Sequence, residues 1–97
     1  MSHLAEIQKA LLNIKPILAD KYNVRTIGLF GSIVRDDYAS ASSDIDILVD
    51  FTKPIGIEFI DLADFIERAI LKKVDLVSKN GIKNKYFSQI EQEIVYV

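Results

Sequence analysis

Two long stretches of the chain repeat apolar residues every three or four positions, the spacing that places them on one face of a helix. The first stretch follows Ser2, a candidate N-cap, and contains Pro16 in its second half. The second covers residues 57–71, and residues 86–94 predict a shorter last helix, with Tyr86 and Phe87 as core contacts. The positions expected to face inward are Leu4, Ile7, Leu11, Ile14 and Leu18 in the first stretch and Ile60, Ala63, Ile66 (or Phe65) and Ile70 in the second.

Other segments have the composition or the alternation of β-strands. The segment before Gly31 is rich in β-branched and aromatic residues. The next one alternates between an apolar face and a face that carries Asp44, Asp46 and Asp50, interrupted only by Leu48. The predicted strands are residues 24–30, 44–51, 73–78 and 95–97.

The connections complete the prediction of the fold. Residues 33–35 predict the start of a short helix, residues 36–43 a polar loop, and Asn80-Gly81 a turn. Helices alternate with strands along the chain. This order predicts an α/β (α+β) fold in which helices pack on a small mixed β-sheet.

Composition limits the chemistry that is available. A chain of 97 residues forms one small domain, residues 1–97, and its net charge of −2 argues against direct nucleic-acid binding. The chain has no cysteine and a single histidine, His3, which excludes disulfides, thiol nucleophiles and multi-histidine metal sites. No apolar run approaches ~18 residues and no signal-peptide pattern is recognised, so we expect a cytoplasmic protein without a membrane span.

Gly31-Ser32 follows the first predicted strand directly. The pair fits an ordinary turn, because glycine accepts a positive φ and serine caps a following helix. It also fits a phosphate cradle, since glycine admits a phosphate to the backbone and the N–H groups at a helix start face an anion. Both interpretations stay open at the level of these two residues.

Asp44 and Asp46 are two positions apart on a predicted strand, so their side chains point the same way. Two carboxylates this close repel each other unless a cation lies between them. Mg²⁺ prefers one or two carboxylates together with waters and substrate phosphates. The pair therefore predicts a site that holds Mg²⁺ against a nucleoside triphosphate, although aspartates at this spacing also occur on ordinary exposed strand faces.

Asp75 and Arg35 are further candidates. If the strand that carries Asp75 neighbours the strand of Asp44 and Asp46, three carboxylates converge, as in two-metal phosphoryl or nucleotidyl transfer. Otherwise Asp75 is a charge at an exposed strand end. Arg35 reaches either a phosphate or one of its neighbours, Asp36 or Asp37.

The combined pattern resembles the minimal nucleotidyltransferases (MNT-domain proteins) of the DNA polymerase β-like nucleotidyltransferase superfamily. The resemblance covers nearly the whole chain and includes the closing segment 93–97. It rests on the motifs GS at 31–32, SDIDILVDF at 43–51 and VDLV at 74–77, with Arg35 in the interval between the first two.

The resemblance implies a function and a role for each matching residue. Gly31, Ser32 and Arg35 would bind the nucleotide, and Asp44, Asp46 and Asp75 would be the catalytic carboxylates that hold Mg²⁺. Many members are type VII-like antitoxins that transfer AMP from ATP to a tyrosine of a partner HEPN-domain ribonuclease toxin. We therefore expect an ATP- and Mg²⁺-dependent protein adenylyltransferase that forms a hetero-oligomer with its toxin.

The chain departs from the family pattern in its polar loop. Eleven residues, Ile33 through Ser43, separate Gly31-Ser32 from Asp44, one more than is usual, and Asp36 stands where glycine is common. Loops absorb insertions readily. Catalysis is more sensitive, because a misplacement of ~1 Å can cost ~100-fold in rate.

Two other functions compete with protein adenylylation. One is an antitoxin that neutralises its toxin by stoichiometric binding, with apolar residues such as Ile55, Ile57, Ile94 and Val95 at the interface or simply completing the core. The other is transfer to an RNA end or an aminoglycoside. This chain has neither an added substrate domain nor the basic surface that an RNA acceptor favours.

Overall fold

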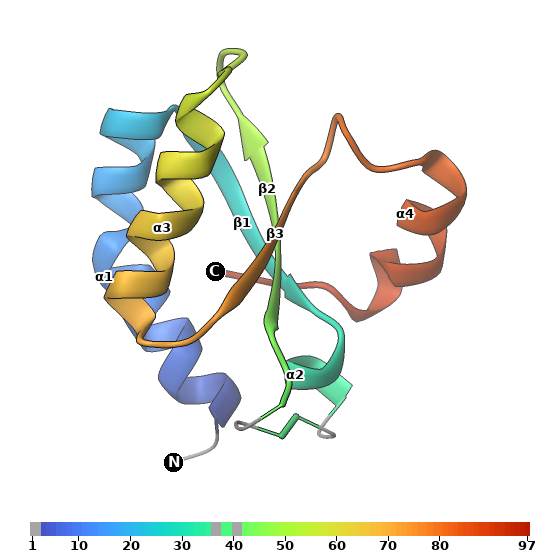
Figure 1. Ribbon diagram of the computed structural model, residues 1–97. Helices are drawn as coiled ribbons and strands as arrows, with labels where there is room; N and C mark the ends of the chain where they lie inside the picture. The colour runs from blue at the N-terminus through green and yellow to red at the C-terminus, as the bar shows by residue number, and fades with distance from the viewer. Residues whose placement is uncertain (1–2, 36–37, 40–41) are drawn as a thin grey trace.

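The computed structural model describes residues 3–35, 38–39 and 42–97 (Figure 1). The predicted N-cap Ser2 and the loop positions Asp36 and Asp37 lie outside these ranges. The elements, in chain order, are α1 (His3–Tyr22), β1 (Val24–Phe30), α2 (Ser32–Arg35), β2 (Ile45–Phe51), α3 (Glu58–Ile70), β3 (Val74–Ser78), α4 (Asn84–Ile90), the 3-10 turn η1 (Glu91–Glu93) and β4 (Val95–Tyr96).

Strands within the described ranges form one four-stranded sheet in the order β3-β2-β1-β4. β1 pairs antiparallel with β2 and with β4, whereas β2 pairs parallel with β3. The parallel pair needs a crossover connection, which α3 supplies. The sheet is therefore mixed, as the sequence predicts.

Helices cover both faces of this sheet. α1 and α3 lie side by side on one face, and α4 lies on the other (Figure 1). The larger core cluster, between the sheet and the α1–α3 layer, includes Leu11, Ile47 and Leu62. The smaller one lies on the side of α4, where Leu48 packs with Phe30 and Ile90. Leu48 interrupts the polar face of its strand because α4 covers that position.

Helix α1 continues through Pro16, although proline removes one backbone hydrogen bond. Its cost inside a helix is about 3 kcal/mol. Burial of one leucine contributes about 1.5–3 kcal/mol, and both Leu11 and Leu18 are fully buried. Tertiary packing therefore outweighs the local penalty. None of the helices formed by the described residues combines the length and the apolar character needed to cross a membrane.

Three sequence predictions are wrong in detail. Ile60 does not face inward: its side chain is 65% exposed, and Leu62 is fully buried in its place. Tyr86 is 47% exposed rather than a core contact. The last helix covers Asn84–Ile90 instead of 86–94, because the chain tightens into η1 before it joins the sheet. For Ile60 and Tyr86, the apolar spacing fits two faces of the helix, and only the position of the sheet selects one.

Candidate active site

Asp46 and Asp75 lie directly opposite each other on the parallel strands β2 and β3. The condition that the sequence left open, that these two strands are neighbours, is therefore met, and two carboxylates occupy adjacent positions of the sheet. Asp44 precedes β2, which begins at Ile45, so its predicted place within the strand is wrong. The side chains of Asp44 and Asp75 are exposed, and that of Asp46 is half-buried.

Negative charge dominates the electrostatics around Asp46. Burial and, to a smaller extent, the nearby carboxylates of Asp75 and Asp44 together raise the pKa of Asp46 from the usual 3.8 to about 6. The Arg35 guanidinium acts in the opposite direction. Since like charges disfavour ionisation of a carboxyl, a cation at this position would relieve the repulsion.

Gly31 places the end of β1 against Asp46. The last residue of β1, Phe30, is the register partner of Asp46. Gly31 then turns the chain into α2 with φ +77°, and a Cβ at this position would overlap the Asp46 carboxylate. Positive φ costs an L-residue about 1–2 kcal/mol. Only glycine permits both this turn and the close approach of the Asp46 side chain to the backbone.

A residue without a predicted role, Glu93, joins this turn. Its Oε1 accepts a hydrogen bond from the backbone N–H of Gly31 at 3.1 Å and another from Nη1 of Arg35 at 3.3 Å. In the sequence, Glu93 belongs only to the closing segment 93–97 of the family resemblance. The one local signal for it is an acidic residue directly before a terminal apolar strand.

The donor set fits a divalent cation that is shared with a ligand. Within the described residues, no three histidine, cysteine or acidic side chains form a ready-made metal cage. Mg²⁺ does not need one, because it takes one or two carboxylates and completes its shell with water and phosphate oxygens. The open pair of Asp46 and Asp75, with Asp44 beside it, matches this preference.

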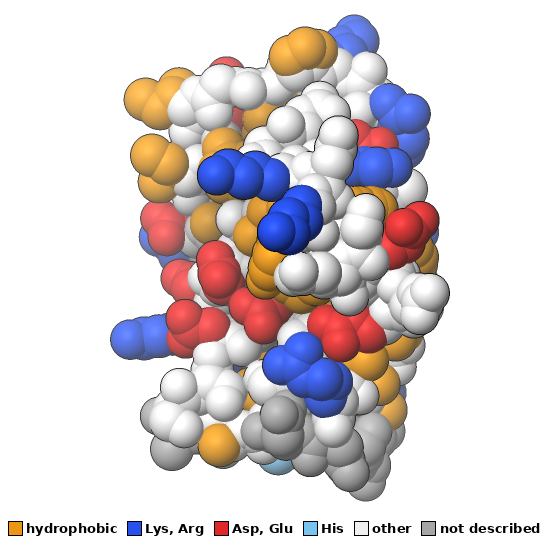
Figure 2. All heavy atoms as spheres, turned by 90° about the vertical axis from the view of Figure 1, so that its right-hand side faces the viewer, with side chains coloured by type: hydrophobic (Ala, Val, Ile, Leu, Met, Phe, Trp, Pro, Cys, Tyr) orange, Lys and Arg blue, Asp and Glu red, His pale blue; other side chains and the backbone are white. Residues whose placement is uncertain are grey.

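The surface around these residues is hollowed and charged. Figure 2 views the face that carries α4: acidic side chains gather across its middle, with basic side chains above and below. Asp44 borders a hollow of about 380 Å³, which is also lined by Ser42, Ser43, Lys72 and Lys73. Of the three predicted carboxylates, only Asp44 lines this space, which is large enough for part of a substrate.

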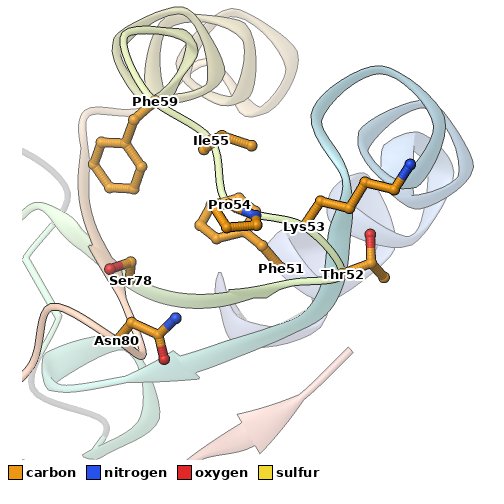
Figure 3. Close-up of a pocket in the computed structure, with 8 residues that line it drawn as sticks. All are labelled: Phe51, Thr52, Lys53, Pro54, Ile55, Phe59, Ser78 and Asn80. Atoms are coloured by element: carbon orange, nitrogen blue, oxygen red, sulfur yellow. The ribbon is translucent and has the colours of Figure 1, made fainter.

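Another hollow, of about 350 Å³, lies at the far end of β2 (Figure 3). Its described lining includes Phe51, Lys53, Phe59 and Asn80 and contains none of the six predicted site residues. This lining contains no acidic side chain, and its basic side chain is Lys53. The described lining of this hollow therefore offers no acidic ligand for a cation.

Comparison with known proteins shows the family of the chain. Residues 12–96 match the family model described as polymerase beta, nucleotidyltransferase. The chain is 41% identical over 98 residues to "Protein adenylyltransferase MntA" of Thermococcus cleftensis, with 100% of this chain and 98% of that protein covered.

Solved structures share the fold. A minimal nucleotidyltransferase superposes with a TM-score of 0.80 at 24% identity, covering 98% of this chain and 95% of its own. A chain of the complex between an MNT antitoxin and the tri-AMPylated Shewanella oneidensis HEPN toxin gives a TM-score of 0.67 at 26% identity. The match covers 93% of this chain and 70% of that chain. A chain of a toxin-antitoxin structure with AMP-PNP gives a TM-score of 0.69 at 25% identity, and the match covers 97% of this chain and 71% of that chain. The family match spans most of the chain and the fold agrees with it, so this protein belongs to the polymerase beta nucleotidyltransferase family.

Proposed function

We propose that this protein is a Mg²⁺-dependent adenylyltransferase that transfers AMP from ATP to a tyrosine hydroxyl of a HEPN-domain toxin, and so acts as its antitoxin. The observation that carries the proposal is the juxtaposition of Asp46 and Asp75 beside the turn at Gly31. Acidic groups for a cation and a backbone turn for a phosphate meet at one place, as nucleotidyl transfer requires.

Each predicted residue has a role in this proposal. Asp44 and Asp46 hold Mg²⁺, and Asp75 completes the set of metal-site carboxylates. Gly31 and Ser32 bind the triphosphate, and the Arg35 guanidinium pairs with its phosphate oxygens. Mg²⁺, when bound, neutralises phosphate charge and lowers the pKa of the attacking hydroxyl.

The transfer is one displacement at phosphorus. The tyrosine oxygen attacks the α-phosphorus of ATP and forms a new P–O bond, while the bond between the α-phosphorus and the bridging oxygen breaks. Pyrophosphate leaves with that oxygen. Asp75, an exposed carboxylate at the start of β3, accepts the hydroxyl proton.

Similarity to complexes supports the choice of partner. A structural neighbour is an MNT antitoxin bound to an AMPylated HEPN toxin, and another is a toxin-antitoxin structure with AMP-PNP, an ATP analogue. A sequence relative that spans the full chain is named as a protein adenylyltransferase. These likenesses favour a protein acceptor over an RNA end or a small molecule.

The test is mass spectrometry of the partner toxin after incubation with this protein, ATP and Mg²⁺. We expect the wild type to add one or more AMP units and Asp44→Asn/Asp46→Asn to add none. Asp50→Asn is the matched control, because Asp50 lies on the same strand at the far end and faces Arg25. Its transfer should match that of the wild type.

Stoichiometry separates catalysis from simple occlusion. An enzyme silences an excess of toxin in the presence of ATP, whereas a binder needs an equimolar amount with or without ATP. A stable complex that shows no added mass and silences the toxin only at equimolar ratio would overturn the proposal in favour of occlusion.

A further inference from the structure

Glu93 is the one described acidic residue that pairs with both the Gly31 turn and Arg35. Its Oε1 accepts a hydrogen bond from the backbone N–H of Gly31, with an N···O distance of 3.1 Å. Nη1 of Arg35 lies 3.3 Å from Oε1 and 3.4 Å from Oε2 of the same carboxylate. The Glu93 side chain is 23% exposed and that of Arg35 is 55% exposed. One side chain thus links the C-terminal segment to two residues of the proposed nucleotide site.

The register of the sheet explains this position. β4 pairs antiparallel with β1 through Gly28↔Tyr96 and Leu29↔Val95 (Figure 1). Two more steps along both strands would place Glu93 opposite Gly31. The backbone leaves the ladder before that point, because η1 ends at Glu93.

The carboxylate therefore takes the place of the missing strand carbonyl. Gly31 is buried, and a buried backbone N–H needs an acceptor. A charged acceptor also makes a stronger bond than a neutral carbonyl does. The turn that approaches Asp46 is consequently fixed from the opposite side of β1 by the C-terminal segment.

We propose that Glu93 is a positioning residue for the nucleotide site: it fixes the Gly31–Ser32 turn and holds Arg35 ready for the triphosphate. This inference rests on the proposed function. Arg35 sits at the end of the four-residue helix α2, and its long side chain loses freedom when it binds a phosphate. Holding it in place beforehand reduces that loss, so the ligand binds more tightly.

A blocking role for Glu93 has the opposite effect on nucleotide affinity. An acidic side chain on Arg35 would act as a blocking anion if the triphosphate had to displace it. Loss of the Glu93 charge would then strengthen nucleotide binding. Displacing Glu93 would break its hydrogen bond with the buried Gly31 N–H and its contact with Arg35 at the same time, and this double cost favours the positioning role.

The experiment measures the affinity for ATP with Mg²⁺ by isothermal titration calorimetry, well below the unfolding midpoint of every variant. The variants are Glu93→Ala, which removes both contacts, and Glu93→Gln, which keeps an oxygen for Gly31 but loses the charge. Glu91→Gln is the matched control, since it makes the same change on an exposed position of the same turn. We expect Glu93→Ala to weaken ATP binding roughly 10-fold and Glu91→Gln to bind ATP as the wild type does. The affinity of Glu93→Gln should lie between those of the wild type and Glu93→Ala.

A double-mutant cycle with Arg35→Met measures the coupling between Glu93 and Arg35 in ATP affinity. A residue that only stabilised the fold would show no such coupling. If Glu93 acts through Arg35, the loss from Glu93→Gln should largely disappear in the Arg35→Met background. Additive losses in the cycle would overturn the proposal, as would unchanged affinity in Glu93→Ala with only a lower unfolding midpoint. Tighter binding in Glu93→Gln would overturn it in favour of a blocking anion. Absence of ATP binding in the wild type is a distinct result, because it overturns the proposed function and the inference together.

Discussion

Asp46 and Asp75 are register partners on two neighbouring parallel strands, so their carboxylates project from adjacent positions of the sheet. The crossover through α3 makes this neighbourhood possible, since it returns the chain to the edge of β2 in the parallel direction. The result is a concentration of negative charge that the protein alone does not neutralise. Several measurable consequences follow from that charge and from the turn beside it.

The first prediction concerns the stability of the metal-free protein. The pKa of Asp46 is about 6 in the fold and 3.8 in the unfolded chain, so the folded state binds more protons between these values. The free energy of unfolding therefore falls as the pH rises through this window. Asp46→Asn cannot ionise and escapes the loss.

Urea denaturation in EDTA, at a series of pH values from about 4 to 8, tests this sign. We expect wild type and Asp46→Asn to be nearly equal at the acidic end, and Asp46→Asn to be more stable at the alkaline end. Asp61→Asn, an exposed change on α3, is the control and should follow the wild type. A difference between wild type and Asp46→Asn that does not vary with pH would contradict the prediction.

The second prediction concerns the removal of Mg²⁺. A ligand that binds only the folded state stabilises it, and Mg²⁺ also relieves the repulsion between Asp46 and Asp75. We expect saturating Mg²⁺ to raise the thermal midpoint of the wild type by several degrees at pH 8, and EDTA to reverse the change. Asp44→Asn/Asp46→Asn should show little response. An equal response in both proteins would place the cation elsewhere.

The third prediction concerns the turn. Gly31→Ala should lower the free energy of unfolding by at least about 1–2 kcal/mol, because alanine is strained at positive φ. Its Cβ also overlaps the Asp46 carboxylate, so ATP affinity should fall with stability. Gly56→Ala is the comparison, since the nearest atom to its added Cβ, the Glu58 Oε2, is 3.7 Å away. A stable Gly31→Ala variant would argue against this geometry.

The fourth prediction compares two positions that lie on different faces of α3. Leu62 is 0% exposed and Ile60 is 65% exposed. Truncation of a buried leucine to alanine costs about 2–5 kcal/mol, whereas an exposed change stays within about 0.5 kcal/mol. Chemical denaturation of Leu62→Ala and Ile60→Ala measures both. Similar losses in the two variants would mean that α3 packs through a different face.

The sequence by itself determined the local structure. Periodicity at three and four residues located α1 and α3, and alternation located β2, because these patterns depend only on near neighbours in the chain. The need for glycine at position 31 was also local, since a turn between a strand and a helix requires a backbone conformation that other residues resist.

The tertiary structure decided which distant residues meet. The register of Asp46 with Asp75 and the hydrogen bond from Gly31 to Glu93, 62 positions apart, follow from strand pairings that no local pattern encodes. The inward face of α3, set by Leu62 instead of Ile60, depends on where the sheet lies. Short-range spacing specifies an element, whereas the contacts between elements arise from the packing of the whole chain, and the proposed site is made of such contacts.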